Sequence, residues 1–381
     1  MTNGVRDRLY DLLERLDREL DRDDEEKIHE LHRDALEFRP VDRLPVVVAC
    51  SEEHPEDMQP YAYSEAVEDP EKMLFNELVS AFGTSILRRG EIGDDLPATV
   101  RANFGTIMVA SCFGARLDWV DDNPPWVHHF ETRDDLVRSI EKGADLNSTS
   151  VERAIEFMEF YHHTLADFPE LREIVKIVIP DLQGPLDNAA MLRGSDIFIE
   201  MATDADFVSS LLSQMAQTQL ELWRRFFRLA ANEDEGYVHQ HGVLGKGNIL
   251  IRNDSSIMIS SEMYEDLVRP RDVTVLDGVG GGGIHSCGDI NHLFPVYAQS
   301  DFAASIDYGQ SWMNDLDAQY DSAASQGVAL LRVRAERDEL VDATILDRFP
   351  TGVSLIYESE SVDEARETLS RYRDAAEARS V

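Results

Sequence analysis

A histidine and a cysteine one residue apart stand where a run of four glycines ends. The segment runs Asp277–Gly–Val–Gly–Gly–Gly–Gly–Ile–His285–Ser–Cys287–Gly288. On a strand, residues two apart project from the same face, so both side chains can reach one ion. Imidazole and thiolate together suit zinc, which takes four tetrahedral ligands and keeps one position open in catalytic sites. The segment therefore predicts two zinc ligands, His285 and Cys287.

A second pair of metal-capable side chains is His239-x-His241. If it also lies on a strand that neighbours the first, the two pairs could share an ion or a reaction centre. Hydrogen-bonded histidines that line a polar pocket are the alternative, and the residues alone leave both interpretations open.

Other polar side chains directly follow apolar runs along the chain. They are Cys50, Glu52, His54, Asp181, Gln183, Asp307, Tyr308, Arg334, Glu358 and Glu360. If these runs are strands of one sheet, their polar ends meet at one edge of it. The catalytic candidates are His239, His241, Asp181 and Tyr308.

Gln183 and Lys246 are the candidates for binding a cofactor or substrate. Lys246 stands between two glycines, and its ammonium could bind a substrate carboxylate or phosphate. A mobile surface lysine explains the same pattern. Cys50 and Cys112 are interpreted as small core residues, because three cysteines form no disulfide framework.

The elements that must position these residues alternate between strand and helix. From Leu171 to the C-terminus, short β-branched runs alternate with helical stretches, and the segment Arg43–His54 is the first strand candidate. About eight strands result, which favours a (β/α)₈ TIM-type barrel with its active site at the carboxyl ends of the strands. The glycine run before His285 does not lie between a strand and a helix, and no G-x-G-x-x-G with a following acidic residue supports a dinucleotide-binding fold.

The first 42 residues are expected to form a charged helical extension before a barrel at 43–381. Leucines recur there at helical spacing, which predicts a lid or the arm of a homodimer. They are Leu9, Leu12, Leu13, Leu16 and Leu20.

The formal net charge is −38, and five of the 36 basic residues are lysines. At molar salt the Debye length falls to about 3 Å, which screens such self-repulsion, so we interpret the charge as halophilic adaptation. An acidic patch for a basic partner is the alternative. The charge argues against nucleic-acid binding, and the lack of a long apolar run or a leader-like N-terminus predicts a cytoplasmic protein without a membrane span.

Three segments resemble motifs of the uroporphyrinogen decarboxylase superfamily. They are Asp181–Leu–Gln–Gly–Pro–Leu–Asp187 with Leu192–Arg–Gly194 and Asp204, then Asp254–Ser–Ser–Ile–Met–Ile–Ser260–Ser–Glu262–Met–Tyr264 with Pro270, and Gly283–Gly288. The resemblance covers roughly Arg43 to the C-terminus. It implies a distorted (β/α)₈ barrel, in agreement with the strand count.

The decarboxylase branch of this superfamily binds tetrapyrrole carboxylates through arginines after the first strand. Here that place reads Ala49–Cys50–Ser51–Glu52–Glu53–His54. Glutamates would repel such a substrate. A carboxy-lyase acting on a tetrapyrrole or another small carboxylate is therefore the second interpretation, and a non-catalytic corrinoid- or ligand-binding barrel is the third.

The methyltransferase branch moves a methyl group from a corrinoid protein, or another methylated donor, to a thiol. Its His-x-Cys pair binds zinc, which corresponds here to His285 and Cys287, and zinc lowers the pKa of the thiol. A late cysteine completes the zinc site in that branch, but Leu355–Ile–Tyr–Glu358–Ser–Glu360 stands in its place. We expect Glu358 as the third ligand, with Glu360, His239 and His241 as alternatives. The resemblance thus implies zinc, a small-molecule substrate and a corrinoid protein as partner.

Overall fold

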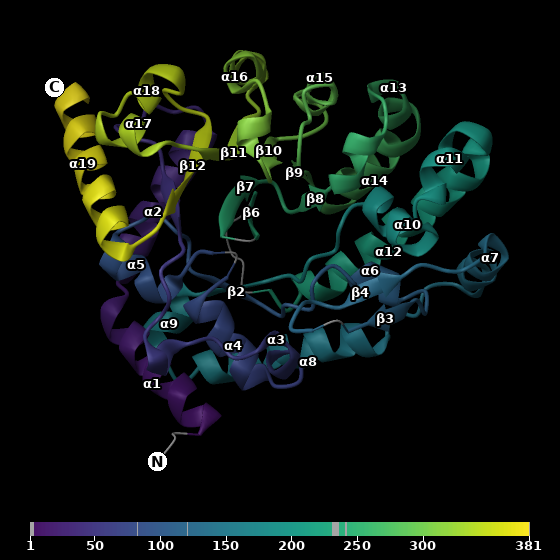
Figure 1. The fold of residues 1–381 in the computed structure, drawn as a ribbon, viewed down its shortest axis with the longest axis horizontal. Coiled ribbons are helices and arrows are strands. Elements are labelled where there is room, and N and C mark those ends of the chain that lie inside the picture. The colour runs from purple at the N-terminus through teal and green to yellow at the C-terminus, as the bar shows by residue number, and fades with distance from the viewer. Residues whose placement is uncertain (1–3, 82, 120, 231–235, 241, 381) are drawn as a thin grey trace.

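The computed structural model describes residues 4–380 apart from 82, 120, 231–235 and 241. Its centre is a six-stranded parallel sheet in the order β1-β12-β11-β10-β9-β8 (Figure 1). The strands are β1 Val46–Cys50, β2 Thr99–Arg101, β3 Arg116–Asp118, β4 Trp126–His128, β5 Lys176–Val178, β6 Tyr237–Gln240, β7 Val243–Lys246, β8 Leu250–Arg252, β9 Gly283–Ser286, β10 Ser305–Tyr308, β11 Ala329–Arg334 and β12 Val353–Ser359. Most residues of the six strands are buried, as expected for parallel sheet covered on both faces.

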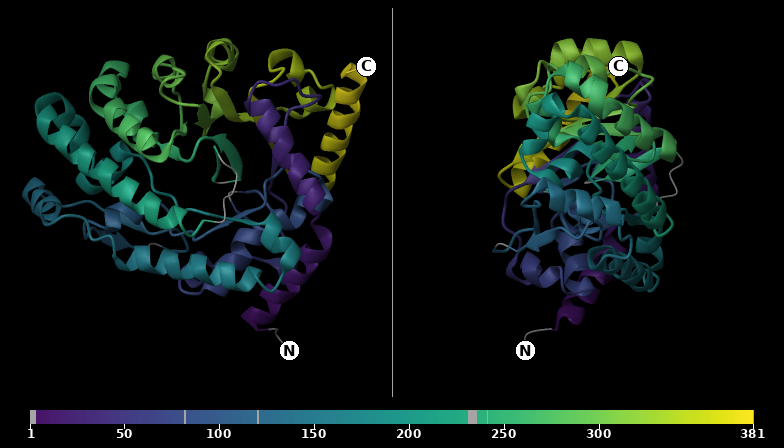
Figure 2. Two further views of the ribbon diagram at one scale, coloured as in Figure 1. Left: turned by 180° about the vertical axis from the view of Figure 1, so that it is seen from behind. Right: turned by 90° about the vertical axis from the view of Figure 1, so that its right-hand side faces the viewer.

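Helices surround the strands on both sides. They are α1 Val5–Glu19, α2 Arg22–Leu36, α3 Tyr63–Ala66, α4 Pro70–Val79, α5 Ile86–Ile92, α6 Met108–Ser111, α7 Arg133–Lys142, α8 Thr149–Leu165, α9 Pro169–Ile174, α10 Pro185–Arg193, α11 Asp196–Thr203, α12 Ala205–Phe227, α13 Ser261–Met263, α14 Arg269–Val279, α15 Phe294–Tyr297, α16 Leu316–Gln326, α17 Arg337–Val341, α18 Ile345–Arg348 and α19 Val362–Ser380, with the short helices η1 Glu56–Met58, η2 Asp254–Met258, η3 Tyr264–Val268 and η4 Ser311–Met313. In both face-on views, α15, α16 and α18 lie along one edge of the molecule and α4 and α8 along the opposite edge (Figure 2).

The predicted closed barrel is borne out only as an α/β fold with parallel strands. β2 and β5 pair with each other in a separate two-stranded parallel sheet. At the free edge of β1, side-chain carboxylates replace a neighbouring strand: Val46 N donates to Asp95 Oδ2 and Val48 N to Asp94 Oδ2, each at 2.9 Å. The described residues therefore form no continuous eight-stranded ladder, because these carboxylates take the backbone donors that β2 would need.

The segment expected to carry His239-x-His241 on a central strand forms a hairpin instead. β6 and β7 pair with each other in antiparallel fashion. The last residues of β7 and those that follow it contact the segments directly before β9 and β11. Asn248 N donates to Gly281 O at 2.9 Å, and Lys246 Nζ donates to Gly327 O at 3.3 Å. The hairpin thus lies beside the amino-terminal ends of the strands, whereas the candidate site lies at the carboxyl ends.

The expected N-terminal helices are present and pack on the rest of the same chain. Leu9, Leu12, Leu13 and Leu16 are fully buried, and α1 packs against α4 and α9. In α2, the Glu25 carboxylate pairs with Arg89 and accepts from Ala98 N at 3.0 Å. These leucines are therefore core residues rather than a surface for a second copy, and the homodimer stays a prediction.

Within the described ranges, no helix combines the length and the apolar character that crossing a bilayer requires.

Candidate metal centre

β9 delivers the two predicted metal ligands to one place. His285 lies on the strand and is 2% exposed, and Cys287 follows it and is half-buried. Gly309, directly after β10, leaves space for the thiol, because a Cβ at that position would lie 2.5 Å from Cys287 Sγ. Cys287 Sγ lies 3.5 Å from His285 Nε2, so the two side chains meet at one point.

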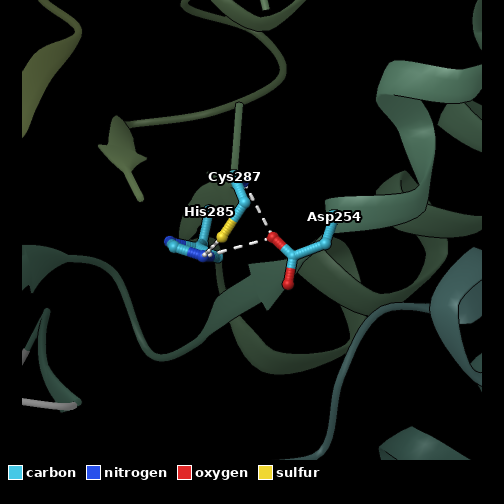
Figure 3. Close-up of side chains that lie close together, drawn as sticks. All are labelled: Asp254, His285 and Cys287. Carbon is cyan, nitrogen blue, oxygen red and sulfur yellow. Dashed lines mark hydrogen bonds and ion pairs between the residues drawn. The ribbon is translucent and has the colours of Figure 1, made fainter. Parts of the chain in front are cut away.

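Asp254, directly after β8, completes a cluster of three donors (Figure 3). Its Oδ1 lies 3.3 Å from His285 Nε2 and accepts a hydrogen bond from Cys287 N at 2.8 Å. The three ligand atoms lie within 4.8 Å of one another, and no other group of three such residues is found in the part of the chain that the structure describes. Nitrogen, sulfur and carboxylate oxygen are the donors that zinc accepts in proteins.

The opposite nitrogen of His285 is held by a buried carboxylate. His285 Nδ1 lies 2.7 Å from Asp307 Oδ2 on β10, and Asp307 is wholly buried. Arg332 Nε donates to Asp307 Oδ1 at 2.6 Å, and its Nη2 also contacts Oδ2. Such a carboxylate fixes the tautomer of a metal-binding histidine. Nε2 is then the nitrogen left for a cation.

A bulge in β11 places Arg332 in this network. The pairing of β11 with β12 shifts register between Leu330 and Val333, and Arg332 has a φ of +55°. Non-glycine residues rarely adopt this left-handed conformation, and bulges redirect side chains near functional sites. The bulge turns the Arg332 guanidinium toward Asp307 and away from the regular ladder.

Charges inside the cluster shift the pKa values of its members. Burial disfavours protonated His285, but Asp307 and Asp254 outweigh it and raise the pKa of the ring to about 10. For Asp307, burial is overcome by Arg332 and His285, which hold the pKa of its carboxyl well below its usual range. His285 also holds the pKa of Asp254 low against burial. A protonated His285 and the guanidinium of Arg332 therefore balance the charges of Asp254 and Asp307, and a bound cation would take over the role of the histidine proton.

Glu358 and Tyr308 are not brought to this cluster. The Glu358 side chain is 51% exposed and lies 3.4 Å from Arg334 Nη1, because it alternates with the buried Tyr357 and Ser359 at the end of β12. Tyr308 is buried on the other side of β10 from Asp307, and its hydroxyl donates to Gln319 Oε1 of α16 at 2.6 Å. In the structure, Asp254 and not Glu358 lies with His285 and Cys287.

Asp181 and Gln183 lie after β5, next to β8. Both are buried, and Asp181 Oδ1 accepts from the backbone and side-chain nitrogens of Gln183 at 2.9 Å. Asp181 Oδ2 lies 3.0 Å from Arg252 Nε. Arg252 in turn is the β8 register partner of His285, so Asp181 and Gln183 lie beside the strand pair that carries the cluster.

His239 and Lys246 lie on the hairpin beside the opposite ends of the strands. The His239 ring is buried, with its centroid 4.9 Å from that of His29 on α2. Lys246 Nζ lies 3.5 Å from a Glu37 oxygen. Neither joins the cluster at Cys287, and His241 lies outside the described residues.

Asp254, Asp307 and Arg332 lie in or next to the cluster, and sequence reasoning gave them no role. Asp307 stands at a predicted strand end and Asp254 opens a superfamily-like segment, so both carried a signal. Arg332 carried none, because the alternation within β11 does not show the bulge. A cavity of about 920 Å³ lined by residues such as Asp21, Arg43 and Arg373 contains no member of the cluster.

No known protein family and no curated protein matches this sequence. Among solved structures, a methyltransferase from Methanosarcina mazei superposes with a TM-score of 0.61. The match covers 90% of this chain and 96% of that chain at 15% sequence identity. The likeness shows a shared fold over nearly the full length of both proteins.

Proposed function

We propose that this chain is a metal-dependent enzyme of the methyltransferase type, which moves a methyl group from a methylated donor to a thiol. The observation that carries the proposal is the convergence of His285 Nε2, Cys287 Sγ and Asp254 Oδ1 within 4.8 Å. The likeness in fold to a methyltransferase supports it.

The three donors fit zinc with one coordination position left for a substrate. When bound there, zinc would lower the pKa of an acceptor thiol so that the thiolate is present at neutral pH. Asp307 and Arg332 orient His285, and the Cys287 backbone nitrogen orients Asp254. The residues of this chain thus hold three donors in place before any ligand arrives.

A corrinoid-carrying protein is the proposed methyl donor. Apolar side chains are exposed after β8 and β10, namely Ile257, Met258, Trp312 and Met313. A Cβ at Gly288, next to Cys287, would lie 3.1 Å from Ile257 Cδ1, so part of this surface adjoins the cluster. Exposed apolar side chains beside a reaction centre suit a protein that must bring its cofactor to the site.

The carboxy-lyase alternative gains no support from the site. Glu52 and Glu53 stand where the decarboxylases have arginines. Their backbone carbonyls accept hydrogen bonds from the Arg88 guanidinium at 2.7 and 2.8 Å. These nitrogens are therefore already engaged and do not bind a substrate carboxylate.

The proposal is tested on protein purified in molar salt. We expect close to one equivalent of zinc or a similar transition metal per chain, and metal-dependent methylation of a small thiol by methylcobalamin. Cys287→Ser should lose both. Less than roughly a tenth of an equivalent of metal after reconstitution, or thiol methylation unaffected by Cys287→Ser, would refute the proposal. Conversion of uroporphyrinogen III to coproporphyrinogen would establish the lyase instead.

A further inference from the structure

A buried carboxylate outside the cluster binds the backbone that carries Asp254. Asp187, in the first turn of α10, is 4% exposed. Its Oδ2 accepts a hydrogen bond from Asp254 N at 2.9 Å, and its Oδ1 accepts one from Ser255 N at 2.7 Å. Both oxygens of one side chain are therefore directed at the peptide segment where β8 ends and η2 begins.

The helix dipole of α10 does not account for this arrangement. An acidic residue in the first turn of a helix stabilises the helix, and it does so on an exposed surface. Asp187 is instead withdrawn from solvent, and both of these hydrogen bonds run to a different part of the chain. Burying a carboxylate costs free energy that its hydrogen bonds must offset. The contact with residues 254 and 255 is therefore the specific feature of Asp187.

The start of α10 approaches the same segment closely at a second point. Gly184 N donates to Arg252 O at 2.7 Å. A Cβ at Gly184 would lie 2.3 Å from that oxygen and 2.4 Å from Asn253 Oδ1, so a residue without a side chain is required there. Gly184 and Asp187 thus attach the first turn of α10 to the backbone of residues 252, 254 and 255.

The other side of this segment is attached to β9. Asn253 N donates to His285 O at 2.8 Å, and Ser286 Oγ donates to Asn253 O at 3.0 Å. The Asp254 carboxylate accepts from Cys287 N at 2.8 Å. Because the backbone is bound on both sides, the Asp254 carboxylate is held at its position 3.3 Å from His285 Nε2.

We propose that Asp187 is a positioning residue, which holds the Asp254 backbone so that the Asp254 carboxylate lies with His285 and Cys287. That an ion binds at this cluster rests on the proposed function, whereas the contacts of Asp187 do not. Partners that orient a metal ligand typically change metal affinity by about 10–100-fold. Asp187 acts through Asp254, so its effect on metal affinity disappears when the Asp254 carboxylate is removed.

A double-mutant cycle on zinc affinity tests this coupling. Wild type, Asp187→Asn, Asp254→Asn and the double variant are compared by competition with a chelator in molar KCl. Asparagine keeps the shape of the side chain at 187 but offers one acceptor oxygen to two N–H groups. Asp187→Asn should bind zinc about 10–100-fold more weakly than wild type. In the Asp254→Asn background, the same substitution should change the affinity by about twofold or less, because residues that act through one another are not additive.

Asp95→Asn is the matched control. Asp95 is also a buried carboxylate that accepts a backbone N–H, from Val46 at 2.9 Å, but it lies at β1 and outside the cluster. Its variant should lose stability and bind zinc as wild type does. If Asp187→Asn fails to fold, Asp187→Ser replaces it, because the shorter side chain would leave space for water at the two N–H groups. The serine variant should show the same loss of zinc affinity.

The outcomes separate this inference from the proposed function. Unchanged zinc affinity in Asp187→Asn, or equal losses in the two backgrounds, would overturn the positioning role while leaving the methyltransferase standing. A loss of zinc affinity in Asp95→Asn as large as that in Asp187→Asn would also overturn it, since reduced stability would explain both. The expected cycle in a protein that transfers no methyl group would support the positioning role and refute the methyltransferase. Wild type that binds no zinc would overturn both.

Discussion

Arg332 and Asp307 form a two-point ion pair behind His285. The guanidinium donates to both carboxylate oxygens of Asp307, and Asp307 lies 2.7 Å from His285 Nδ1. Because Asp307 is wholly buried, its charge depends on these two partners. The pair therefore determines how His285 faces Cys287 and Asp254.

Arg332→Met should weaken metal binding by about 10–100-fold, because the partners behind a ligating histidine typically have effects of this size. It should also lower the free energy of unfolding by about 3–5 kcal/mol, since Asp307 is left charged and buried. Zinc affinity is measured by competition with a chelator. Adding Asp307→Asn should restore stability but not metal affinity, and recovery of both would show that Arg332 acts on folding alone.

Asp254→Asn and Glu358→Gln should differ in metal content. Asp254 lies in the cluster, so its amide variant should bind zinc at least tenfold more weakly. Glu358 is exposed and paired with Arg334, so its variant should bind zinc as wild type does. The measurement is zinc per chain after dialysis against a buffered zinc concentration. Weaker zinc binding by Glu358→Gln than by Asp254→Asn would instead identify Glu358 on β12 as the third ligand.

Tyr308→Phe should affect stability and not turnover. The hydroxyl donates to Gln319 Oε1 at 2.6 Å in the layer between sheet and helix. Its loss should cost about 1 kcal/mol, measured by denaturant unfolding in molar salt, while kcat and KM stay within twofold of wild type. A tenfold fall in kcat at unchanged stability would make Tyr308 catalytic, as its strand-end position first indicated.

Asp94 and Asp95 should contribute to stability with opposite dependence on pH. Burial raises the pKa of Asp94 from 3.8 to about 7. A raised folded-state pKa gives stability that is complete below the unfolded value and is lost as the pH rises through about 7. Asp94→Asn keeps an acceptor for Val48 N and removes this loss. It should therefore be more stable than wild type above pH 8, by on the order of 2–3 kcal/mol, and lose this advantage toward pH 4.

Asp95→Asn is the matched control for Asp94→Asn. Arg43 donates to both oxygens of Asp95, at 2.5 and 2.7 Å. Although burial opposes it, this contact lowers the pKa of Asp95 below 3.8, so the carboxylate stabilises the fold above that pH. Asp95→Asn should be destabilised at neutral pH and approach wild type in acid. For both variants the free energy of unfolding is measured by chemical denaturation between pH 4 and 9. The same dependence on pH in both variants would refute the opposite pKa shifts of Asp94 and Asp95.

The sequence by itself determined the α/β alternation and the proximity of His285 and Cys287 at the end of β9. Both follow from local periodicity: β-branched runs form buried strands, and a spacing of two places His285 and Cys287 on one side. The strand ends also contained Asp307 and Asp181, so the general location of the site could be predicted. β11 and β12 lie within the region where the sequence predicts this alternation.

Only the tertiary structure decided which distant residues complete the site. Asp254 and Glu358 are both carboxylates after apolar runs, and local pattern cannot tell that one lies in the cluster and the other faces solvent. The hairpin that holds His239 has the composition of a central strand, yet it pairs with itself beside the opposite ends of the strands. The bulge at Arg332 and the carboxylates that occupy the edge of β1 depend on strand pairing between segments far apart in sequence. Such contacts are set by packing of the whole chain, which no local spacing encodes.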